Sequence, residues 1–471
     1  MSADYIAIDL GASSGRLING EYDGSRIKLK EIHRFINEPV KLNGVLYWDL
    51  FRLFHEIKEG LKKAAAAGIA AVSVGVDTWG VDYGLIDGRG NIIGYPINYR
   101  DARTDNAINE VSEMIPLGEI YNTTGIQFMY YNTIFQLYAD FKMRPDIIKN
   151  ADKLLMTPDL INFLLSGEKL NEYTILSTSQ LLNAADKKPD AGLLKKLNIP
   201  ESLFCEMVTP GNMIGGFTDE IADETGLKNV KVIAVGCHDT ASAVAGTPLS
   251  NDNAAYLSCG TWSLLGVETK APIISDESFK YNFTNEGGVE NTIRFLKNIN
   301  GLWIIQQLRK SYNESNRASL GFGDIIAGAR AARNKDLKID AADPVFNAPQ
   351  DMCKTIAEHL IKSGQGKPDG LGELALAVYN GITDEYAGQV ENLQRLTGKR
   401  IDKINMIGGG IQDEFLCEMS ASKTGRTIEA GPVEASVLGN MIMQLKATGE
   451  ISGLGQGREI IADSFERRVY G

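Results

Sequence analysis

The fold is decided by Tyr5-Ile6-Ala7-Ile8-Asp9-Leu10-Gly11-Ala12-Ser13-Ser14-Gly15-Arg16-Leu17-Ile18. Residues 5–10 and 16–22 are rich in branched or aromatic side chains and the residues between them are small, which predicts a strand, a tight turn and a returning strand. A turn of Gly, Ala and Ser lets backbone N–H groups approach an anion, while Asp9 ends the first strand, where it can hold a cation. A metal-bound polyphosphate needs this pairing. The alternative is an ordinary hairpin, in which the Asp9 side chain accepts a hydrogen bond from the turn.

A second copy of the pattern follows about half a chain later. Residues 255–265 align with residues 6–16, which places Gly260 at the position of Gly11 and Ser263 at that of Ser14. Two such hairpins predict two structurally similar halves that face one nucleotide, with a chance pair as the alternative. Asp9 is replaced by Ser258 in the copy, so only the first half keeps the carboxylate.

The composition predicts a globular protein with two ample cores, since the chain has 471 residues and 44% hydrophobic content. Its 48 Lys and Arg against 60 Asp and Glu give a net charge of -12. An acidic chain without a basic run argues against nucleic acid or an anionic membrane as a partner.

Its five cysteines form no Cys-x-x-Cys pair, so neither a disulfide framework nor a zinc site is predicted. The early first strand leaves no room for a signal peptide and no stretch is apolar enough to span a bilayer, so we expect a cytoplasmic protein.

The order of the elements predicts an α/β architecture. A strand at 26–35, a helix from Asp49 and a buried strand at 69–76 form a mixed sheet with a crossover helix. Residues 100–225 are predicted to be mostly helical. The polar stretch 246–253 marks the predicted boundary between domains 1–246 and 247–471.

The second domain is predicted to contain a long helix at 371–397 and a strand at 403–407. That strand runs into Gly408-Gly409-Gly410, where a flat ring or a phosphate can lie against the backbone.

Three further places carry polar residues next to predicted strands. Asp77, Trp79 and Asp82 provide the carboxylates and the flat apolar face that a polyol site needs, or form a half-buried Trp with turn-forming Asp residues. Asp239 follows a buried strand and begins a helix, which is typical of a ligand site and also of a helix N-cap. Asn298 is either the cap of the next helix or a ligand contact. Residues 282–288 are predicted to form a loop.

Five motifs together resemble the FGGY carbohydrate kinases, in the same order and over nearly the whole chain. They are Asp-Leu-Gly-Ala-Ser-Ser-Gly-Arg at 9–16, Asp-Thr-Trp-Gly-Val-Asp at 77–82, His-Asp-Thr-Ala-Ser-Ala at 238–243, Gly-Thr-Trp-Ser at 260–263 and Gly-Gly-Gly at 408–410. The resemblance implies an α/β fold of two actin-like ATPase (ribonuclease H-like) domains with mixed sheets flanked by helices. It places the active site in the cleft between a sugar-binding N-terminal domain and a nucleotide-binding C-terminal domain.

The resemblance also implies the reaction, the transfer of a phosphoryl group from ATP to a ketose with the help of Mg²⁺. Within the family, the nearest likeness implies L-rhamnulose as the ketose and its C1 hydroxyl as the acceptor, giving L-rhamnulose 1-phosphate and ADP. A related kinase for L-fuculose or xylulose, and a non-catalytic sugar-binding relative, are the alternatives.

Residue by residue, the resemblance implies Asp239 as the proton acceptor and Asp9 as the residue that acts on Mg²⁺ through water. The ATP-binding residues would be Ala12, Ser13, Ser14, Gly15, Arg16, Thr261, Gln306 and Gly409. The sugar-binding residues would be Gly80, His238, Asp239, Thr240 and Asn298. Cys237 and Cys259 stand where the family pattern predicts Ser, next to the catalytic motifs. We expect both to be small packed residues, and sensitivity of the enzyme to oxidation is the alternative.

Overall fold

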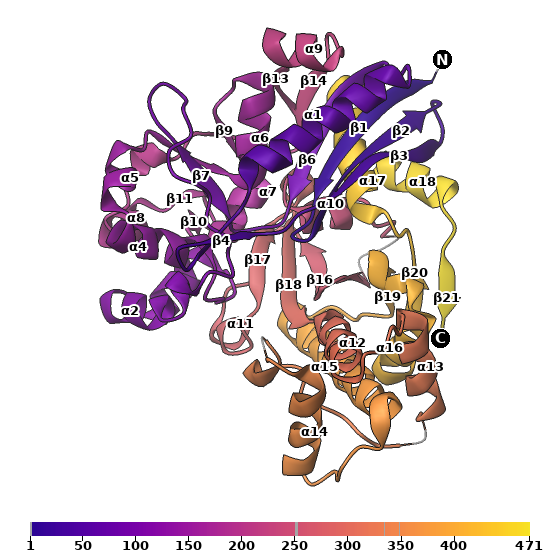
Figure 1. Cartoon of the computed structure of the whole chain (residues 1–471). Coiled ribbons are helices and arrows are strands. Elements are labelled where there is room, and N and C mark those ends of the chain that lie inside the picture. Colours follow the sequence, from indigo (N-terminus) through magenta and orange to yellow (C-terminus); the bar gives the residue numbers. More distant parts are fainter. Residues whose placement is uncertain (1, 250–252, 334, 348) are drawn as a thin grey trace. The chain divides into compact units, whose positions relative to one another are not determined.

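The computed structural model describes residues 2–249, 253–333, 335–347 and 349–471, and Figure 1 shows the course of the chain. It divides into two compact units. The first consists of Met1–Pro248, Glu268–Phe295 and Ala435–Phe465, and the second of Leu249–Val267, Leu296–Glu434 and Glu466–Gly471. Both units are therefore discontinuous in sequence. The boundary at residue 246 stays a prediction about the two halves of the sequence, and residues 250–252 within it lie outside the described residues.

The first unit is built on a six-stranded mixed sheet of order β13-β14-β6-β1-β2-β3. The predicted hairpin is confirmed: β1 and β2 are antiparallel, with Leu10 opposite Gly15. The neighbouring β6 is parallel to β1 and places Asp77 beside Asp9. The strands are β1 (Ala3–Leu10), β2 (Ser14–Tyr22), β3 (Ile27–Ile36), β6 (Ala71–Thr78), β13 (Asn212–Gly216) and β14 (Lys231–Ala234).

Each face of this sheet is covered by a helix, α1 (Leu50–Ala66) on one face and α17 (Ala435–Thr448) on the other (Figure 1). Ile6 and Ile8 of β1 belong to the core that contains Leu53 and Ile57 of α1. Tyr5 and Ala7 belong to the core that contains Met441 of α17. Successive side chains of a strand point to opposite faces, so Asp9 follows Tyr5 and Ala7 and points to the α17 side.

Local signals explain where α1 begins and ends. The side chain of Asp49 caps its first turn by accepting a hydrogen bond from the backbone N–H of Arg52. Buried Leu50, Leu53, Ile57 and Leu61 recur at helical spacing. Beyond the C-cap Ala67, Gly68 takes a positive φ of 77°, which ends the helix as the sequence predicts.

Helices α10 (Asp239–Ala245) and α17 pack with their backbones in close contact. A Cβ on Gly439 would lie 1.8 Å from the carbonyl oxygen of Ser242, and one on Gly246 would lie 2.0 Å from that of Ala435. No side chain fits at either position. The helix that begins at Asp239 is thereby held by the helix that covers the sheet.

The remainder of the first unit is largely helical between residues 100 and 225, as predicted, with short strands interspersed. The further helices are α2 (Ala107–Met114), α3 (Leu117–Thr124), α4 (Thr133–Met143), α5 (Pro145–Asn150), α6 (Thr157–Ser166), α7 (Tyr173–Leu176), α8 (Ala191–Lys196), α9 (Asp219–Thr225), α11 (Asp276–Lys280) and α18 (Leu454–Ser464). The short strands are β4 (Val40–Leu42), β5 (Val45–Tyr47), β7 (Tyr83–Ile86), β8 (Lys153–Met156), β9 (Leu170–Glu172), β10 (Leu182–Asn183), β11 (Lys188–Pro189) and β12 (Glu206–Val208).

The predicted loop at residues 282–288 is wrong. It contains strand β17 (Thr284–Gly287), all four residues of which are buried. Its polar composition suggests a loop, but the segment pairs with the neighbouring strand β18 (Ile293–Asn300). The N–H groups of Asn285 and Gly287 donate to the carbonyl of Gly125 and the hydroxyl of Ser177 instead, so the backbone is satisfied from both sides.

The second unit also has a mixed sheet, with the strand order β18-β16-β15-β19-β20-β21. The predicted hairpin is present as antiparallel β15 and β16, and β19 runs parallel to β15. The long predicted helix is α15, which ends at Gly398 with φ 67°. The further strands and helices are β15 (Ala254–Cys259), β16 (Trp262–Thr269), β19 (Lys403–Ile407), β20 (Thr427–Ala430), β21 (Arg468–Tyr470), α12 (Trp303–Asn316), α13 (Phe322–Ala331), α14 (Met352–Lys362), α15 (Gly370–Thr397) and α16 (Glu414–Thr424). Within the described ranges, no helix combines the length and apolar character needed to cross a bilayer.

Candidate active site

Three carboxylates of the first unit lie at one edge of its sheet. Asp9 and Asp77 stand near the carboxyl ends of β1 and β6, and Asp239 begins the helix that follows β14. These three strands are adjacent and parallel, so their carboxyl ends meet at the same edge, where open α/β sheets bind ligands. The backbone N–H of Thr78 donates to the carbonyl of Cys237 over 2.9 Å, which ties the end of β6 to the start of α10.

Asp9 is 7% exposed and forms an ion pair with Arg16, whose guanidinium nitrogen lies 2.5 Å from Oδ2. The hydroxyl of Ser436 in α17 also donates to Oδ2, over 3.4 Å. The residue expected to act on Mg²⁺ is therefore paired with a residue expected to bind phosphate. Both groups belong to the first hairpin, since Asp9 and Arg16 are cross-strand partners.

The turn of the first hairpin, residues 11–14, has a fixed backbone. The N–H of Gly11 donates to the carbonyl of Ser14 over 2.8 Å. The Asn37 side chain donates to the carbonyl of Gly11 over 2.9 Å, and its backbone N–H donates to that of Ser13 over 3.1 Å. Ala12 and Ser14 are partly exposed and Ser13 is exposed, whereas Gly15 is buried against Phe35. A partly exposed, rigid turn of small residues is what a bound phosphate requires.

Asp77 is fully buried. Asn440 of α17 donates to its Oδ2 over 2.6 Å, whereas its Oδ1 has no hydrogen-bond partner among the described residues. Burial, together with the charge of Asp9, raises the pKa of Asp77 well above its ordinary value. Burial and the neighbouring Asp9 therefore favour the protonated form of Asp77.

Asp82 is the centre of a closed hydrogen-bond network. The indole N–H groups of Trp48 and Trp79 donate to its Oδ2 over 2.6 and 2.9 Å, and the amide of Gln136 donates to its Oδ1 over 2.9 Å. Asp82 is 0% exposed, and burial raises its pKa to about 6. The buried positions of Asp77, Trp79 and Asp82 favour the structural interpretation of this motif over the polyol site.

Asp239 is the first residue of α10, and His238 takes the N-cap position. The N-cap interpretation of Asp239 is therefore wrong. Its side chain is 35% exposed, accepts a hydrogen bond from Thr240 Oγ1 over 3.0 Å and lies 3.4 Å from His238 Nε2. Burial raises the pKa of Asp239, and the neighbouring His238 offsets part of that rise. A partly exposed carboxylate with a raised pKa is suited to accept a proton.

The sugar-site candidates of the first unit lie close together around His238. A Cβ placed on Gly80 would lie 3.3 Å from His238 Nε2, so the glycine leaves room beside the imidazole. Asp239 and Thr240 follow His238 directly. Gly80, His238, Asp239 and Thr240 thus form one cluster, with Asp9 at the same sheet edge.

A buried glutamate, which the sequence does not single out, fixes the backbone before Asp239. Glu172 Oε2 accepts the N–H of Cys237, and Thr174 Oγ1 accepts that of His238, each over 3.3 Å. Burial raises the pKa of Glu172 to about 7. Cys237 is 0% exposed and burial raises the pKa of its thiol, so it is a packed residue.

The hairpin of the second unit differs in register from the first. Cys259 lies opposite Ser263, so the connection is one residue shorter, and the alignment of Ser263 with Ser14 is wrong. Ser263 is fully buried and lies within hydrogen-bond distance of Tyr386, with 2.5 Å between their hydroxyl oxygens. Thr261 occupies the turn and is partly exposed.

The start of helix α12, which carries Gln306, is hydrogen-bonded to this turn. The N–H groups of Leu302 and Trp303, where α12 begins, donate to the carbonyls of Gly260 and Thr261 over 3.2 and 3.1 Å. Gln306 lies one turn into α12 and donates its N–H to Leu302 over 2.9 Å.

The triple glycine packs against the same hairpin. A Cβ on Gly408 would lie 2.8 Å from the carbonyl oxygen of Cys259, and one on Gly410 would lie 2.7 Å from Cys259 Cβ. Gly409 alone is exposed, and a Cβ there would meet nothing within 4 Å. Two glycines are therefore needed for packing, and the middle one leaves its backbone open to a ligand.

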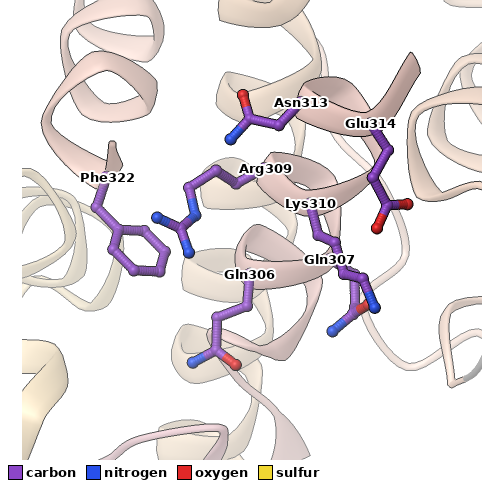
Figure 2. A pocket seen from close by; sticks show the side chains of 7 residues that line it. All are labelled: Gln306, Gln307, Arg309, Lys310, Asn313, Glu314 and Phe322. Carbon is purple, nitrogen blue, oxygen red and sulfur yellow. The ribbon is translucent and has the colours of Figure 1, made fainter. Parts of the chain in front are cut away.

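A pocket of about 580 Å³ opens beside Gln306 along α12 (Figure 2). The guanidinium of Arg309 lies 4.0 Å from the centre of the Phe322 ring on one side of it. Gln307, Lys310, Asn313 and Glu314 line the remainder. Asn298 lies within β18 of the same unit; the N-cap of α12 is Leu302, so Asn298 is not that cap.

Family models match both parts of the chain. Residues 4–246 match the N-terminal domain of the FGGY family of carbohydrate kinases, and residues 255–448 match its C-terminal domain. The chain belongs to the FGGY family of carbohydrate kinases. This confirms the family that the motifs predicted, and this FGGY kinase has the predicted α/β fold with two mixed sheets flanked by helices.

Curated relatives cover nearly the full length of this FGGY kinase. It is 43% identical to the rhamnulokinase of Halalkalibacterium halodurans, over 99% of this chain and 98% of that protein. It is 38% identical to the rhamnulokinase of Bacillus subtilis, over 99% and 95% respectively.

Solved structures share the fold at low identity. The ligand-bound xylulose kinase of Lactobacillus acidophilus has a TM-score of 0.82 at 16% identity, covering 99% of this chain and 93% of that one. Plasmodium falciparum glycerol kinase with ADP has a TM-score of 0.81 at 15% identity, covering 100% and 94%.

The residues present fit a lightly held Mg²⁺. The described residues contain no group of three or more His, Cys, Asp or Glu side chains placed to hold a metal. Mg²⁺ usually keeps several waters and takes only one or two protein carboxylates together with substrate phosphates. A single carboxylate such as Asp9 is sufficient for that role.

Proposed function

We propose that this FGGY kinase is a rhamnulokinase, which transfers the γ-phosphoryl group of ATP to the C1 hydroxyl of L-rhamnulose. The full-length similarity to rhamnulokinases supports the substrate. The observation that carries the chemistry is Asp239, a 35% exposed carboxylate with a raised pKa beside His238 at the carboxyl edge of the sheet. The products are L-rhamnulose 1-phosphate and ADP.

In the proposed reaction Asp239 accepts the proton of the C1 hydroxyl as its oxygen forms a bond to the γ-phosphorus. The bond between that phosphorus and the bridging oxygen of ADP breaks, and ADP leaves with the electron pair. A positioned proton acceptor contributes about 10²–10⁴ in rate. Phosphoryl transfer otherwise depends on positioning and on stabilising the charge of the phosphoryl oxygens.

The proposed ATP-binding residues are divided between the two units. In the first, the turn from Ala12 to Ser14 offers its backbone to the phosphates, and Arg16 supplies a positive charge. In the second, Thr261, Gln306 and Gly409 hold the nucleotide. Bound Mg²⁺, held by Asp9 through water, would neutralise the phosphate charge.

The proposed sugar-binding residues are Gly80, His238, Asp239 and Thr240 of the first unit and Asn298 of the second. The imidazole of His238, the carboxylate of Asp239, the hydroxyl of Thr240 and the amide of Asn298 can form hydrogen bonds with the hydroxyls of a ketose, and Gly80 leaves room beside the imidazole. We also propose a cytoplasmic location, which the five free cysteines support.

A panel of ketoses tests the proposal. L-rhamnulose, L-fuculose, L-xylulose and D-xylulose are each incubated with ATP and Mg²⁺, and ADP release is coupled to NADH oxidation. We expect the highest kcat/KM with L-rhamnulose and phosphorylation at C1 by NMR of the product. A higher kcat/KM for another ketose would identify that ketose, and not L-rhamnulose, as the substrate. Sugar binding without ADP release from any ketose would identify a non-catalytic relative.

A further inference from the structure

A buried ion pair outside the recognised motifs contacts the sugar-site histidine. Arg294 of β18 is 0% exposed, and its NH1 lies 3.2 Å from Oε2 of Glu286 in β17. Its Nε donates to the carbonyl of Gly287 over 2.8 Å. Its NH2 lies 3.1 Å from Nδ1 of His238, within hydrogen-bond geometry. All four residues belong to the first unit.

A buried ion pair of this kind contributes little to the stability of a fold. Burial removes the hydration of both charges, which is unfavourable. Their mutual attraction offsets this loss only when the remaining polar atoms of both groups form hydrogen bonds. Here neither Arg294 NH1 nor Glu286 Oε2 has a hydrogen bond of regular geometry among the described residues. Burial raises the pKa of Glu286, but the neighbouring charge of Arg294 holds it below its ordinary value, so the glutamate is ionised. The pair also contacts His238 through Arg294 NH2.

The chemistry of arginine determines which nitrogen of the neutral His238 ring carries the proton. A guanidinium has only donors and stays protonated in proteins, so Nδ1 of the imidazole must be the acceptor of this hydrogen bond. In the neutral ring the proton then lies on Nε2. Nε2 is the atom that faces Asp239 Oδ1 at 3.4 Å and lies beside Gly80.

We propose that Arg294, held by Glu286, fixes His238 as the Nε2–H tautomer, so that His238 donates a hydrogen bond at the sugar site and leaves proton acceptance to Asp239. Arg294 and Glu286 are positioning residues. The catalytic consequence rests on the proposed function, whereas the tautomer is a property of the free protein. Glu286 Oε2 is also 3.3 Å from Nδ1, so it is ready to accept a proton from Nδ1 if Arg294 is replaced.

Nitrogen NMR of the histidine side chains tests the tautomer without any substrate. The chain has four histidines, so ¹⁵N-histidine labelling gives few signals, and His238→Gln identifies those of His238. We expect an unprotonated Nδ1 and a protonated Nε2 at neutral pH. Arg294 reaches Glu286 and His238 with two different nitrogens, NH1 and NH2. In Arg294→Lys the single amino group pairs with Glu286 and leaves Nδ1 without a donor, so we expect the proton to move to Nδ1, which lies 3.3 Å from Glu286 Oε2. A protonated Nδ1 in the unsubstituted protein, or a tautomer that Arg294→Lys leaves unchanged, would overturn the proposal.

Kinetics of the same variant test the consequence. Loss of one oriented hydrogen bond predicts a roughly tenfold rise in the KM of the ketose, with the KM of ATP unchanged. The matched control is Arg103→Lys, since Arg103 is also buried and its Nε lies 3.2 Å from the buried Asp140. We expect this control to lower stability similarly and to leave both the ketose KM and the His238 tautomer unchanged. If both variants raised the KM of the ketose equally, Arg294 would contribute only to the stability of the fold.

The double variant Glu286→Gln/Arg294→Met covers the case in which Arg294→Lys does not fold. It removes both buried charges, and we expect His238 to populate both tautomers in it. A His238 that keeps only the Nε2–H tautomer would overturn the proposal. Because the NMR result needs no turnover, failure of every ketose in the panel would refute the proposed function and leave the tautomer to be decided separately.

Discussion

The two hairpins share a sequence pattern and differ in what the fold makes of them. In the first, Leu10 lies opposite Gly15, leaving four residues between them, and Asp9 pairs with Arg16. In the second, Cys259 lies opposite Ser263, leaving three residues between them, and Ser258 replaces the carboxylate. The first is charged and has a partly exposed turn. The second is neutral, and two glycines and the start of α12 pack tightly around it.

The difference suggests that the two hairpins have different roles. A carboxylate at the sheet edge can act on a cation or a proton, whereas a neutral hairpin with an open backbone can hold a ligand without competing for its metal. We therefore expect the first hairpin to act on the phosphates and on Mg²⁺, and the second hairpin to hold the nucleotide. The four predictions below challenge or refine that assignment.

The largest effect is expected at the acceptor carboxylate. Asp239→Asn should lower kcat by about 10²–10⁴ because the C1 hydroxyl loses its proton acceptor. Binding of ATP and ketose, measured by calorimetry, should persist. Asp49→Asn is the control: it removes a carboxylate at the N-cap of α1, where Asn caps equally well, and should leave kcat unchanged. A near-normal kcat in Asp239→Asn would refute the assignment of the base.

The aligned positions Asp9 and Ser258 should respond differently to the metal. Asp9→Asn should raise the Mg²⁺ concentration for half-maximal rate by about 10–100-fold, the usual range when a group that orients a metal or its ligands is lost. Ser258→Ala should leave the Mg²⁺ titration unchanged, since the second hairpin carries no carboxylate. If both variants shift it equally, the two hairpins do not differ in the proposed way.

The triple glycine should separate packing from binding. Gly410→Ala should lower the free energy of unfolding by about 1–3 kcal/mol, because the added methyl meets Cys259. Gly409→Ala should change stability by less than about 0.5 kcal/mol and raise the KM of ATP, since its Cβ points into open space. Urea unfolding and ATP titration measure the two effects. An unchanged ATP KM in Gly409→Ala would remove Gly409 from the nucleotide site.

The smallest effect concerns pH. Asp239 must be ionised to accept a proton, and burial raises its pKa above the ordinary aspartate value. The kcat/KM of the ketose should therefore rise with pH as Asp239 loses its proton, and fall on acidification while an ordinary aspartate would still be ionised. The KM of ATP should change little over the same range. An acid limb at the ordinary aspartate pKa would show that the raised pKa does not govern turnover.

Much of the local structure could be predicted because its signals are local. Asp49 and Gly398 mark a helix start and a helix end through hydrogen bonding and positive φ, and both hairpins follow from strand propensity around small residues. Many of the candidate residues lie in the motifs, and within the first unit the structure brings Gly80, His238, Asp239 and Thr240 together. The sequence left the polyol and structural interpretations of Asp82 open because the partners that favour the structural one, Trp48 and Gln136, lie far away in sequence.

The sequence by itself determined the order and kind of the main elements, the family, and most of the residues now proposed for the reaction, since periodicity, caps and short motifs act over a few residues. Only the tertiary structure decided that Glu286 and Arg294 contact His238, that Asn440 contacts Asp77, and that the second hairpin is one residue tighter. These are contacts or registers set by packing between segments far apart in the chain, and no local pattern specifies them.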